Sequence, residues 1–227
     1  MRILVACEES QAVTIELRKL GHEAYSCDIV ECSGGHPEWH TQGDALKLIN
    51  GSGDNFGQIY FVTQDNTSHL LPRKWDMIIA HPPCTYLSAA GASRMFPVKG
   101  GPPDPERFAK GQEAAAFFTA FLEAECPRIA VENPVPMKCF GLPAYNQIVQ
   151  PYLFGEPWYK RTCFWLKGLE ELRPTTRVEP QGYWVQRSGK RTKGCYGGHR
   201  DPKKRSKTFP GIAKAMAEQW AGCAYAK

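Results

Sequence analysis

The first 29 residues limit the possible folds of this chain more than any other stretch. RILVAC (2–7) is a short apolar run, residues 12–21 carry apolar side chains at helical spacing up to Gly21, and HEAYSCDI (22–29) is a second apolar run. A strand, a helix and a strand within about 30 residues form a βαβ unit. The two strands of such a unit are parallel, so the sequence predicts a parallel sheet with a crossover helix.

The rest of the chain continues this alternation. Further strands are predicted at IYFV (59–62), DMIIA (76–80), RIAVEN (128–133) and TCFWL (162–166), with helices at about 110–125 and 210–222. The 227 residues can bury one substantial core, so we expect one main domain. The order favours an α/β fold with a doubly wound sheet, in which ligands bind at the carboxyl ends of the strands.

Two features of the composition bear on where the protein works. The apolar stretches are too short to span a bilayer, and Glu8 and Glu9 stand where a signal peptide needs its apolar centre. Nine cysteines, an odd number at irregular spacings, indicate reduced thiols rather than a disulfide framework. We therefore expect a soluble cytoplasmic protein with no membrane partner and no obligate protein partner.

Positive charge is concentrated in one segment. Residues 177–207 contain ten Lys or Arg against Glu179 and Asp201, a net +8 that leaves −3 on the rest of a chain whose total is +5. Such a segment indicates an anionic partner. The alternative is a solvated basic loop.

Four polar or reactive residues fall just past the ends of four predicted strands. They are Asp28, Asp44, Cys84 and Glu132. An acid after the second strand is placed to accept hydrogen bonds from a nucleoside ribose, and Asp44 is placed to accept one from an adenine amino group. For each aspartate the alternative is a turn or cap residue.

Two consecutive prolines make Cys84 the strongest candidate nucleophile. Proline fixes φ and removes hydrogen-bond donors, so Pro82 and Pro83 hold the next side chain in one direction. A thiol of ordinary pKa is only partly ionised at neutral pH, and a nearby Arg or backbone N–H would increase the thiolate fraction. The alternative is a buried structural cysteine.

Glu132 follows an apolar strand in AVENPVP. A carboxylate is costly to bury unless it is hydrogen-bonded or protonated, so Glu132 is a candidate acid. The alternative is a salt bridge to a neighbouring Lys or Arg.

Together these motifs resemble the DNA cytosine-C5 methyltransferase family, in a short form similar to those that bacteriophages encode. The family has a cofactor loop after strand one, an acid after strand two, GD after strand three, a Pro-Cys loop and an ENV-type acid. Here these stand as VACEESQ, Asp28, GDA, PPCTYLS and ENP. YKRTCFWL is similar to the family's next basic strand, and the resemblance covers about residues 1–168 and 206–227.

The resemblance implies a doubly wound Rossmann-like fold that binds S-adenosyl-L-methionine. It divides the chain into a catalytic core (1–168), a small basic DNA-recognition segment (169–207) and a C-terminal helix that packs back on the core (208–227). The host cytoplasm is the expected location if a phage encodes the chain. The cofactor-binding residues that it implies are Ala6, Glu8, Glu9, Ser10, Asp28, Asp44 and Pro83.

The chain also departs from the family pattern. ACEESQ lacks the glycines of the usual cofactor loop, Thr85 replaces a glutamine, and Pro134 replaces an apolar residue. The target-recognition region, 169–207, is shorter than usual, which favours a short or relaxed DNA sequence specificity.

The catalytic roles implied by the resemblance agree with the chemistry of the residues. Cys84 would add to C6 of cytosine while Glu132 hydrogen-bonds or protonates N3, which makes C5 able to accept a methyl group. Arg161 takes the position of an arginine near the substrate. The base must leave the duplex to be reached, and the loop from Thr85 to Gly101 is the predicted lid.

DNA is the expected partner of the basic segment, where aromatic residues are interleaved with cations. The predicted DNA-binding residues are Arg94, Tyr183, Trp184, Arg187, Lys190, Arg191, Lys193, Lys203, Lys204 and Arg205.

Other functions remain open on the sequence alone. Cys27, Cys32, His36 and His40 have a spacing compatible with zinc, although the same stretch is compatible with a loop whose histidines pack or line the cofactor pocket. Thymidylate-synthase-like enzymes use a Pro-Cys nucleophile on free pyrimidine nucleotides. Amino-methyltransferases carry an aromatic residue where this chain has Cys84. An inactive methyltransferase-fold protein that only binds DNA is a further alternative.

Overall fold

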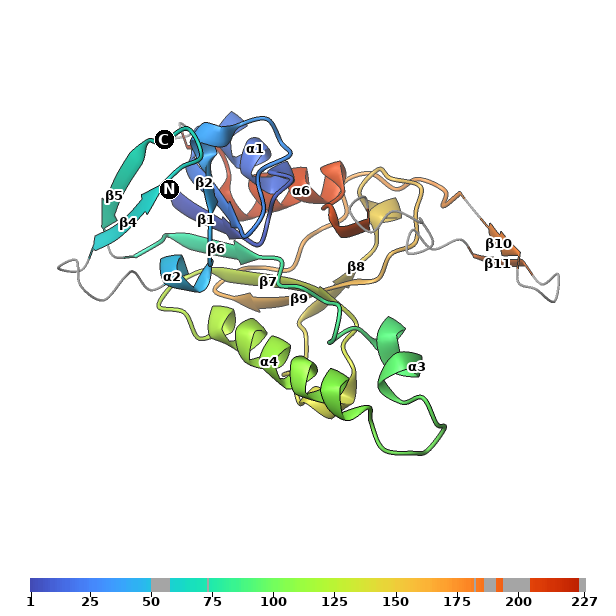
Figure 1. Ribbon diagram of the computed structural model, residues 1–227. Helices are drawn as coiled ribbons and strands as arrows, with labels where there is room; N and C mark the ends of the chain where they lie inside the picture. The colour runs from blue at the N-terminus through green and yellow to red at the C-terminus, as the bar shows by residue number, and fades with distance from the viewer. Residues whose placement is uncertain (50–57, 73, 182, 186–190, 194–204, 225–227) are drawn as a thin grey trace.

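A mixed seven-stranded sheet forms the centre of the molecule (Figure 1). The computed structural model describes residues 1–49, 58–72, 74–181, 183–185, 191–193 and 205–224, and for 183–185 and 191–193 the backbone alone. The strand order is β3-β2-β1-β6-β7-β9-β8. The strands are β1 (Arg2–Ala6), β2 (Glu23–Asp28), β3 (His40–Gln42), β6 (Met77–Ala80), β7 (Ile129–Pro134), β8 (Gln147–Val149) and β9 (Thr162–Lys167).

The direction of the strands identifies the fold. β1 runs parallel to β2 and β6, and β7 runs parallel to β6, whereas β9 runs antiparallel to both β7 and β8. This order is typical of a Rossmann-like methyltransferase core, so the predicted fold class is confirmed. The reversed β9 was not foreseen, because the apolar run at 162–166 indicates a strand but not its direction.

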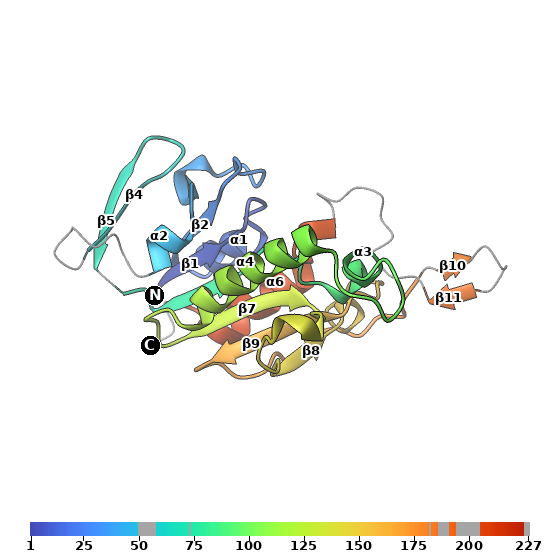
Figure 2. The same ribbon diagram turned by 60° about the horizontal axis from the view of Figure 1, so that its bottom comes forward.

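Helices cover both faces of the sheet, as Figures 1 and 2 show. One face carries α1 (Ala12–Lys19) and α6 (Pro210–Met216), which continues into the π-helical turn η6 (Ala217–Ala221). The opposite face carries α4 (Pro105–Leu122). Shorter helical elements are η1 (Pro37–Trp39), α2 (Leu46–Ile49), η2 (Ala89–Gly91), α3 (Ala92–Met95), η3 (Lys138–Phe140) and η4 (Pro151–Leu153).

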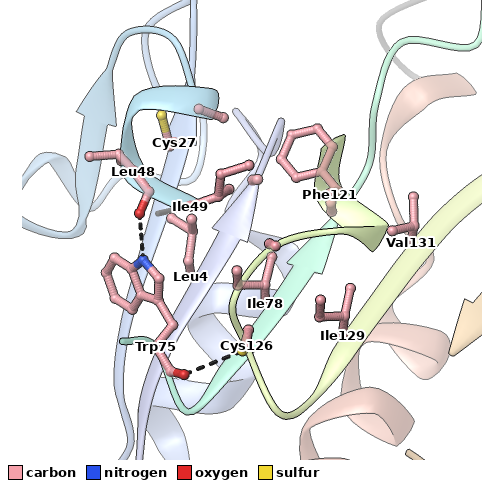
Figure 3. Close-up of a cluster of buried hydrophobic side chains, with 14 of the residues drawn as sticks. Leu4, Cys27, Leu48, Ile49, Trp75, Ile78, Phe121, Cys126, Ile129 and Val131 are labelled. Atoms are coloured by element: carbon pink, nitrogen blue, oxygen red, sulfur yellow. Dashed lines mark hydrogen bonds between the residues drawn. The ribbon is translucent and has the colours of Figure 1, made fainter. Parts of the chain in front are cut away.

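Alternation along the strands divides the core in two. In β1, Leu4 faces the cluster that contains α4, whereas Ile3 and Val5 face the cluster that contains α1 and α6. Figure 3 shows part of the first cluster, in which the indole Nε1 of Trp75 donates to the carbonyl of Leu48 at 2.8 Å. The central strands are buried on both faces, as a doubly wound sheet requires.

The strand predicted at 59–62 does not belong to the main sheet. It lies in β4 (Gln58–Val62), which pairs only with β5 (Ser68–Pro72) as an antiparallel hairpin. The three-residue β3 already occupies the sheet edge beside β2, and it is too short to give a pattern in the sequence. Phe61 of the hairpin packs edge-on against Tyr25, with 5.0 Å between ring centroids.

Other boundaries differ from the prediction for local reasons. α4 begins at Pro105 rather than near residue 110, because Asp104 caps it by accepting a hydrogen bond from the Arg107 backbone N–H at 2.9 Å. The predicted loop 85–101 contains the short helices η2 and α3. Glu132 lies within β7 rather than after it.

The basic segment contains a second hairpin, formed by β10 (Tyr183–Val185) and β11 (Arg191–Lys193), which pair antiparallel. Figure 1 places it away from the main sheet. Within the described parts of the chain, no helix combines the length and apolar character needed to cross a membrane.

Candidate active site

The predicted site residues gather at the carboxyl edge of the sheet. The chain leaves β1 into Cys7 and Glu8, β2 ends at Asp28, and the loop after β6 leads to Cys84. Glu132 lies near the carboxyl end of β7, which is parallel to β6. The fold therefore places these residues along one edge, where doubly wound folds bind ligands.

Glu8 closes the amino end of α1. Its buried carboxylate accepts from the backbone N–H of Val13 at 2.6 Å and from the hydroxyl of Thr14 at 2.8 Å. Burial is the largest influence on this group and raises the pKa of Glu8 above its usual value. The side chain occupies the place where other folds hold a phosphate at a helix N-terminus.

The loop between β1 and α1 keeps left-handed turns without using glycine. Cys7 has φ 58° and Gln11 has φ 56°, and both are conformations that glycine adopts more easily. Uncommon backbone conformations in non-glycine residues are concentrated at functional sites. ACEESQ lacks the usual glycines, but Cys7 and Gln11 adopt the left-handed conformations that the bends of the loop need.

The other predicted residues of this loop lie in different environments. Ala6 is fully buried in β1, while Glu9 and Ser10 are partly exposed. The carboxylate of Glu9 accepts from the Ser33 hydroxyl, which in turn accepts from the Nζ of Lys207 at 2.9 Å. This chain of bonds connects the cofactor loop to the segment that precedes α6.

Both predicted aspartates make local turn bonds. One oxygen of Asp28 accepts from the Val30 N–H at 3.1 Å, and one oxygen of Asp44 accepts from the Leu46 N–H at 3.0 Å. Burial raises the pKa of the Cys27 thiol to about 12, with contributions from the charges of both aspartates, so the two carboxylates lie near the same side chain. The turn bonds use one oxygen of each carboxylate.

Sequence reasoning missed Ile29 at this end of the edge. Its side chain follows Asp28 and is 76% exposed, so an apolar surface adjoins that acid. The signal in the sequence was an aliphatic residue directly after the acid that ends a strand.

The four residues of the zinc alternative do not form a ligand cluster. His40 contacts the Ser26 hydroxyl through Nδ1 at 2.8 Å and the Val30 carbonyl through Nε2 at 3.0 Å. His36 contacts Glu38 and stacks on the Trp39 ring. Over the described ranges, which include all four residues, no group of three or more His, Cys, Asp or Glu side chains is arranged to hold a metal ion.

The Pro-Pro-Cys loop is fixed by contacts to neighbouring strands. The backbone N–H of His81 donates to the Ala6 carbonyl at 2.9 Å, and the buried side chain of Asn133 donates to the Pro82 carbonyl at 2.8 Å. Pro83 is exposed and Cys84 is partly exposed. The rigidity expected from the prolines is therefore reinforced from β1 and β7.

The residues after Cys84 are held against the segment that follows β7. The Ala89 N–H donates to the Val135 carbonyl at 2.8 Å, and the Met137 N–H donates to the Leu87 carbonyl at 2.7 Å. The start of the predicted lid is thus attached to the segment that carries Glu132.

Glu132 is paired with a histidine rather than with a Lys or Arg. Its Oε2 lies 3.2 Å from Nδ1 of His81, and the two side chains are 15% and 9% exposed. Burial acts to raise the pKa of Glu132, but the hydrogen bond to His81 and the charge of Lys160 outweigh it, so the pKa lies below its usual value. The free protein therefore holds Glu132 as a carboxylate at neutral pH.

The Cys84 thiol has the opposite tendency. Burial and the charge of Glu132 raise its pKa, and the positive charges of Lys160 and Arg205 only partly offset them. The expected activation by a nearby cation is present, but the net effect favours the protonated thiol. Cys84 and Glu132 are thus electrostatic neighbours in one site.

Lys160, and not the predicted Arg161, is the cation whose charge acts on both groups. The Nζ of Lys160 donates to the Arg205 carbonyl at 2.9 Å and lies 5.6 Å from the centre of the Phe209 ring. Arg161 is exposed, and its charge acts on Cys163. Lys160 and Arg161 are adjacent in the sequence, which does not show which of the two charges acts on Cys84 and Glu132.

The predicted DNA-binding residues are only partly described. Arg94 is exposed on α3, and Arg205 lies partly buried beside Lys160. Tyr183 and Trp184 belong to β10, and Arg191 and Lys193 belong to β11. The remaining predicted residues, Arg187, Lys190, Lys203 and Lys204, lie outside the described ranges.

Comparisons with known proteins give distant structural likeness. No family model matches the sequence, and no curated protein matches it. A solved structure from E. coli, described as a DNA modification methyltransferase encoded within a prophage, superposes with a TM-score of 0.43 at 14% sequence identity. The match covers 79% of this chain and 52% of that chain, so this chain spans about half the length of that protein.

Proposed function

We propose that this chain is a DNA methyltransferase that transfers a methyl group from S-adenosyl-L-methionine to carbon 5 of cytosine. The observation that supports this most is the pairing of Cys84 with Glu132 at the carboxyl ends of adjacent strands, in a methyltransferase fold. A thiol and a carboxyl group side by side are the two groups that addition to a pyrimidine ring requires.

The residues at the other end of the edge fit S-adenosyl-L-methionine. Asp28 and Asp44 offer acceptors for a ribose and an adenine amino group, and the exposed Ile29 next to Asp28 offers an apolar surface. Glu8 fills the amino end of α1, which disfavours a ligand with phosphates there. S-adenosyl-L-methionine has no phosphate, and when bound it supplies an electrophilic methyl group.

The proposed reaction begins with addition of Cys84 to the base. Its sulfur forms a bond to C6 while N3 receives a proton from Glu132, and the displaced electron pair makes C5 nucleophilic. C5 then accepts the methyl group. Loss of the C5 proton to water allows the sulfur–C6 bond to break, and N3 returns its proton to Glu132. The sulfur regains from water the proton that it lost on addition, so 5-methylcytosine is released and both residues return to their starting states.

The substrate in this proposal is cytosine within DNA. A base inside a duplex cannot reach Cys84, so it must be flipped out of the stack. The net +8 of residues 177–207 supports phosphate binding. Lys160, whose charge acts on the thiol, donates to the Arg205 carbonyl near the end of that segment.

Identification of the labelled nucleoside tests this proposal. The protein is incubated with methyl-labelled S-adenosyl-L-methionine and mixed-sequence DNA, and the DNA is digested to nucleosides. We expect the label in 5-methyldeoxycytidine. Label on an exocyclic nitrogen, or turnover of free nucleotides but not of DNA, would contradict the proposal.

Cys84→Ser tests the nucleophile in the same assay. A hydroxyl without a dedicated base is a much weaker nucleophile, so turnover should fall by several orders of magnitude. Cys139→Ser is the matched control, because Cys139 is an exposed thiol on η3. Wild-type turnover by the Cys84 variant would remove Cys84 from the mechanism.

A further inference from the structure

His81 is paired with the buried Glu132 and also acts electrostatically on the buried Glu8. Its Nδ1 is 3.2 Å from Oε2 of Glu132, and its charge also lowers the pKa of Glu8 against the larger opposing effect of burial. The imidazole is 9% exposed. Among the described residues, its buried Nε2 has no hydrogen-bond partner. This is an unusual environment for a purely structural histidine, because buried ring nitrogens are ordinarily hydrogen-bonded.

The proposed reaction leaves the origin of one proton unexplained. Glu132 must deliver a proton to N3, yet its surroundings favour the carboxylate. Lys160 also acts on Glu132 and stabilises the negative charge further. The acid that protonates the base therefore needs a group that supplies Glu132 with its proton.

We propose that His81 is the source of the proton that Glu132 delivers to N3 of the base. This inference rests on the proposed cytosine chemistry. The proton on Nδ1 of the imidazolium first moves to Oε2 of the Glu132 carboxylate, which leaves a neutral imidazole that keeps its Nε2 proton. The Glu132 carboxyl group then donates that proton to N3. The Cys84 thiol proton leaves to water as the sulfur–C6 bond forms.

The proton returns at the end of the cycle. When the sulfur–C6 bond breaks, N3 gives its proton back to Glu132, and the imidazole becomes protonated again at Nδ1. The number of protons on the pair is then the same as at the start. A positive imidazole beside Glu132 also balances the charge of that buried carboxylate, which would otherwise be costly.

Several charged groups surround this pair. Glu8 faces it from the loop after β1, and Glu132 faces it from β7. Cys84 lies on the same loop as His81, and Lys160 lies two residues before β9. Any pH dependence of the reaction therefore includes the thiol as well as the pair.

The pH profile of His81→Asn tests the inference. An asparagine amide can still donate to Glu132 but cannot take up and release a proton. His81→Asn should lose on the order of 100-fold in kcat at neutral pH and recover part of it at pH 5, where solvent can supply the proton that Glu132 delivers.

His69→Asn is the matched control, because His69 is a hydrogen-bonded histidine in the β4–β5 hairpin, outside the main sheet. It should keep the wild-type pH profile. A His81→Asn variant with uniformly lower kcat and an unmoved profile would show that His81 only positions Glu132. An unchanged kcat would remove His81 from the reaction.

A measurement on the free protein separates this inference from the proposed function. In 15N-histidine NMR spectra at neutral pH, assigned with His81→Asn, the His81 ring should carry protons on both nitrogens and lose one in Glu132→Gln. Failure of the wild type to produce 5-methylcytosine contradicts the proposed function alone. A His81 ring with one proton in the wild type contradicts the proton source, whatever the activity.

Discussion

The two halves of the carboxyl edge are built from different kinds of contact. In the half formed by β1, β2 and β3, the acids bond to nearby backbone: Glu8 to Val13, Asp28 to Val30, and Asp44 to Leu46. In the half formed by β6, β7 and β9, the bonds cross the fold, as between His81 and Glu132, 51 residues apart. The contacts of these three acids follow from local sequence, unlike that of Glu9 with Ser33, whereas the contacts of the second half depend on the whole sheet.

This difference also appears in the charges. Burial raises the pKa of Glu8, which has only neutral donors as hydrogen-bond partners. The pKa of Glu132 is lowered, because His81 and Lys160 reach it from other strands. We infer that the first half is built to bind a ligand and that the second is built to move protons.

Glu132→Gln should have the largest effect on the second half. The amide keeps the size of the side chain but cannot donate a carboxylic proton, so kcat should fall by about 10²- to 10⁴-fold. S-adenosylhomocysteine affinity, measured by calorimetry, should change little. Glu113→Gln, an exposed glutamate on α4, is the control. A comparable loss of cofactor affinity in Glu132→Gln would abolish the distinction between the halves.

Asp28→Ala should have the converse effect on the first half. Loss of one charge-assisted hydrogen bond costs about 1.5 to 3 kcal/mol, which corresponds to a weakening of S-adenosylhomocysteine binding by roughly 10- to 150-fold. DNA affinity should be nearly unchanged. Asp65→Ala is the control, because Asp65 accepts the same type of turn bond from Thr67 in the β4–β5 hairpin. Equal effects of the two substitutions on cofactor binding would make Asp28 a turn residue.

Lys160→Ala and Arg161→Ala separate two neighbouring cations. Loss of the Lys160 charge should raise the Cys84 pKa further, because that charge now lowers it. Alkylation of Cys84 by iodoacetamide, followed by mass spectrometry of its peptide, should then slow by on the order of tenfold at neutral pH. Arg161→Ala should slow it less. The reverse order would restore Arg161 as the cation that faces the thiol.

The pH dependence of stability gives the smallest effect. A raised folded-state pKa means that the contribution of Glu8 is present below about pH 4.3, the unfolded value, and is lost as the pH rises. The lowered pKa of Glu132 means that its contribution is present above about pH 4.3 and is lost as the pH falls. The free energy of unfolding is measured by urea titration at several pH values. Above about pH 4.3 it should decline less with rising pH in Glu8→Gln than in the wild type. Below about pH 4.3 it should decline less with falling pH in Glu132→Gln than in the wild type. The same shift in both variants would contradict the opposite environments.

The sequence predicted what local patterns determine. Apolar periodicity and the positions of proline and glycine predict the βαβ unit, the strand before Cys84, the strand that contains Glu132 and the helix after residue 209. The turn bonds of Asp28 and Asp44 were among the alternatives, because such residues bond to their own backbone.

What the sequence could not give depends on partners distant in the chain. The direction of β9 is set by its pairing with β7 and β8, which no local pattern encodes. No local pattern predicts a role for His81, which precedes two prolines. Its contact with Glu132 forms only when β6 and β7 pair. The choice between Lys160 and Arg161 likewise depends on which way each side chain leaves the backbone.

The most direct test of the central claim is a covalent trap at Cys84. DNA that contains 5-fluorocytosine cannot lose a proton from C5 after methyl transfer, so the adduct should persist. With S-adenosyl-L-methionine present, we predict a denaturation-resistant complex in the wild type but not in Cys84→Ser, and mass spectrometry should place the modified base on the Cys84 peptide. No complex with an active wild-type protein, or an adduct on another cysteine, would contradict the account.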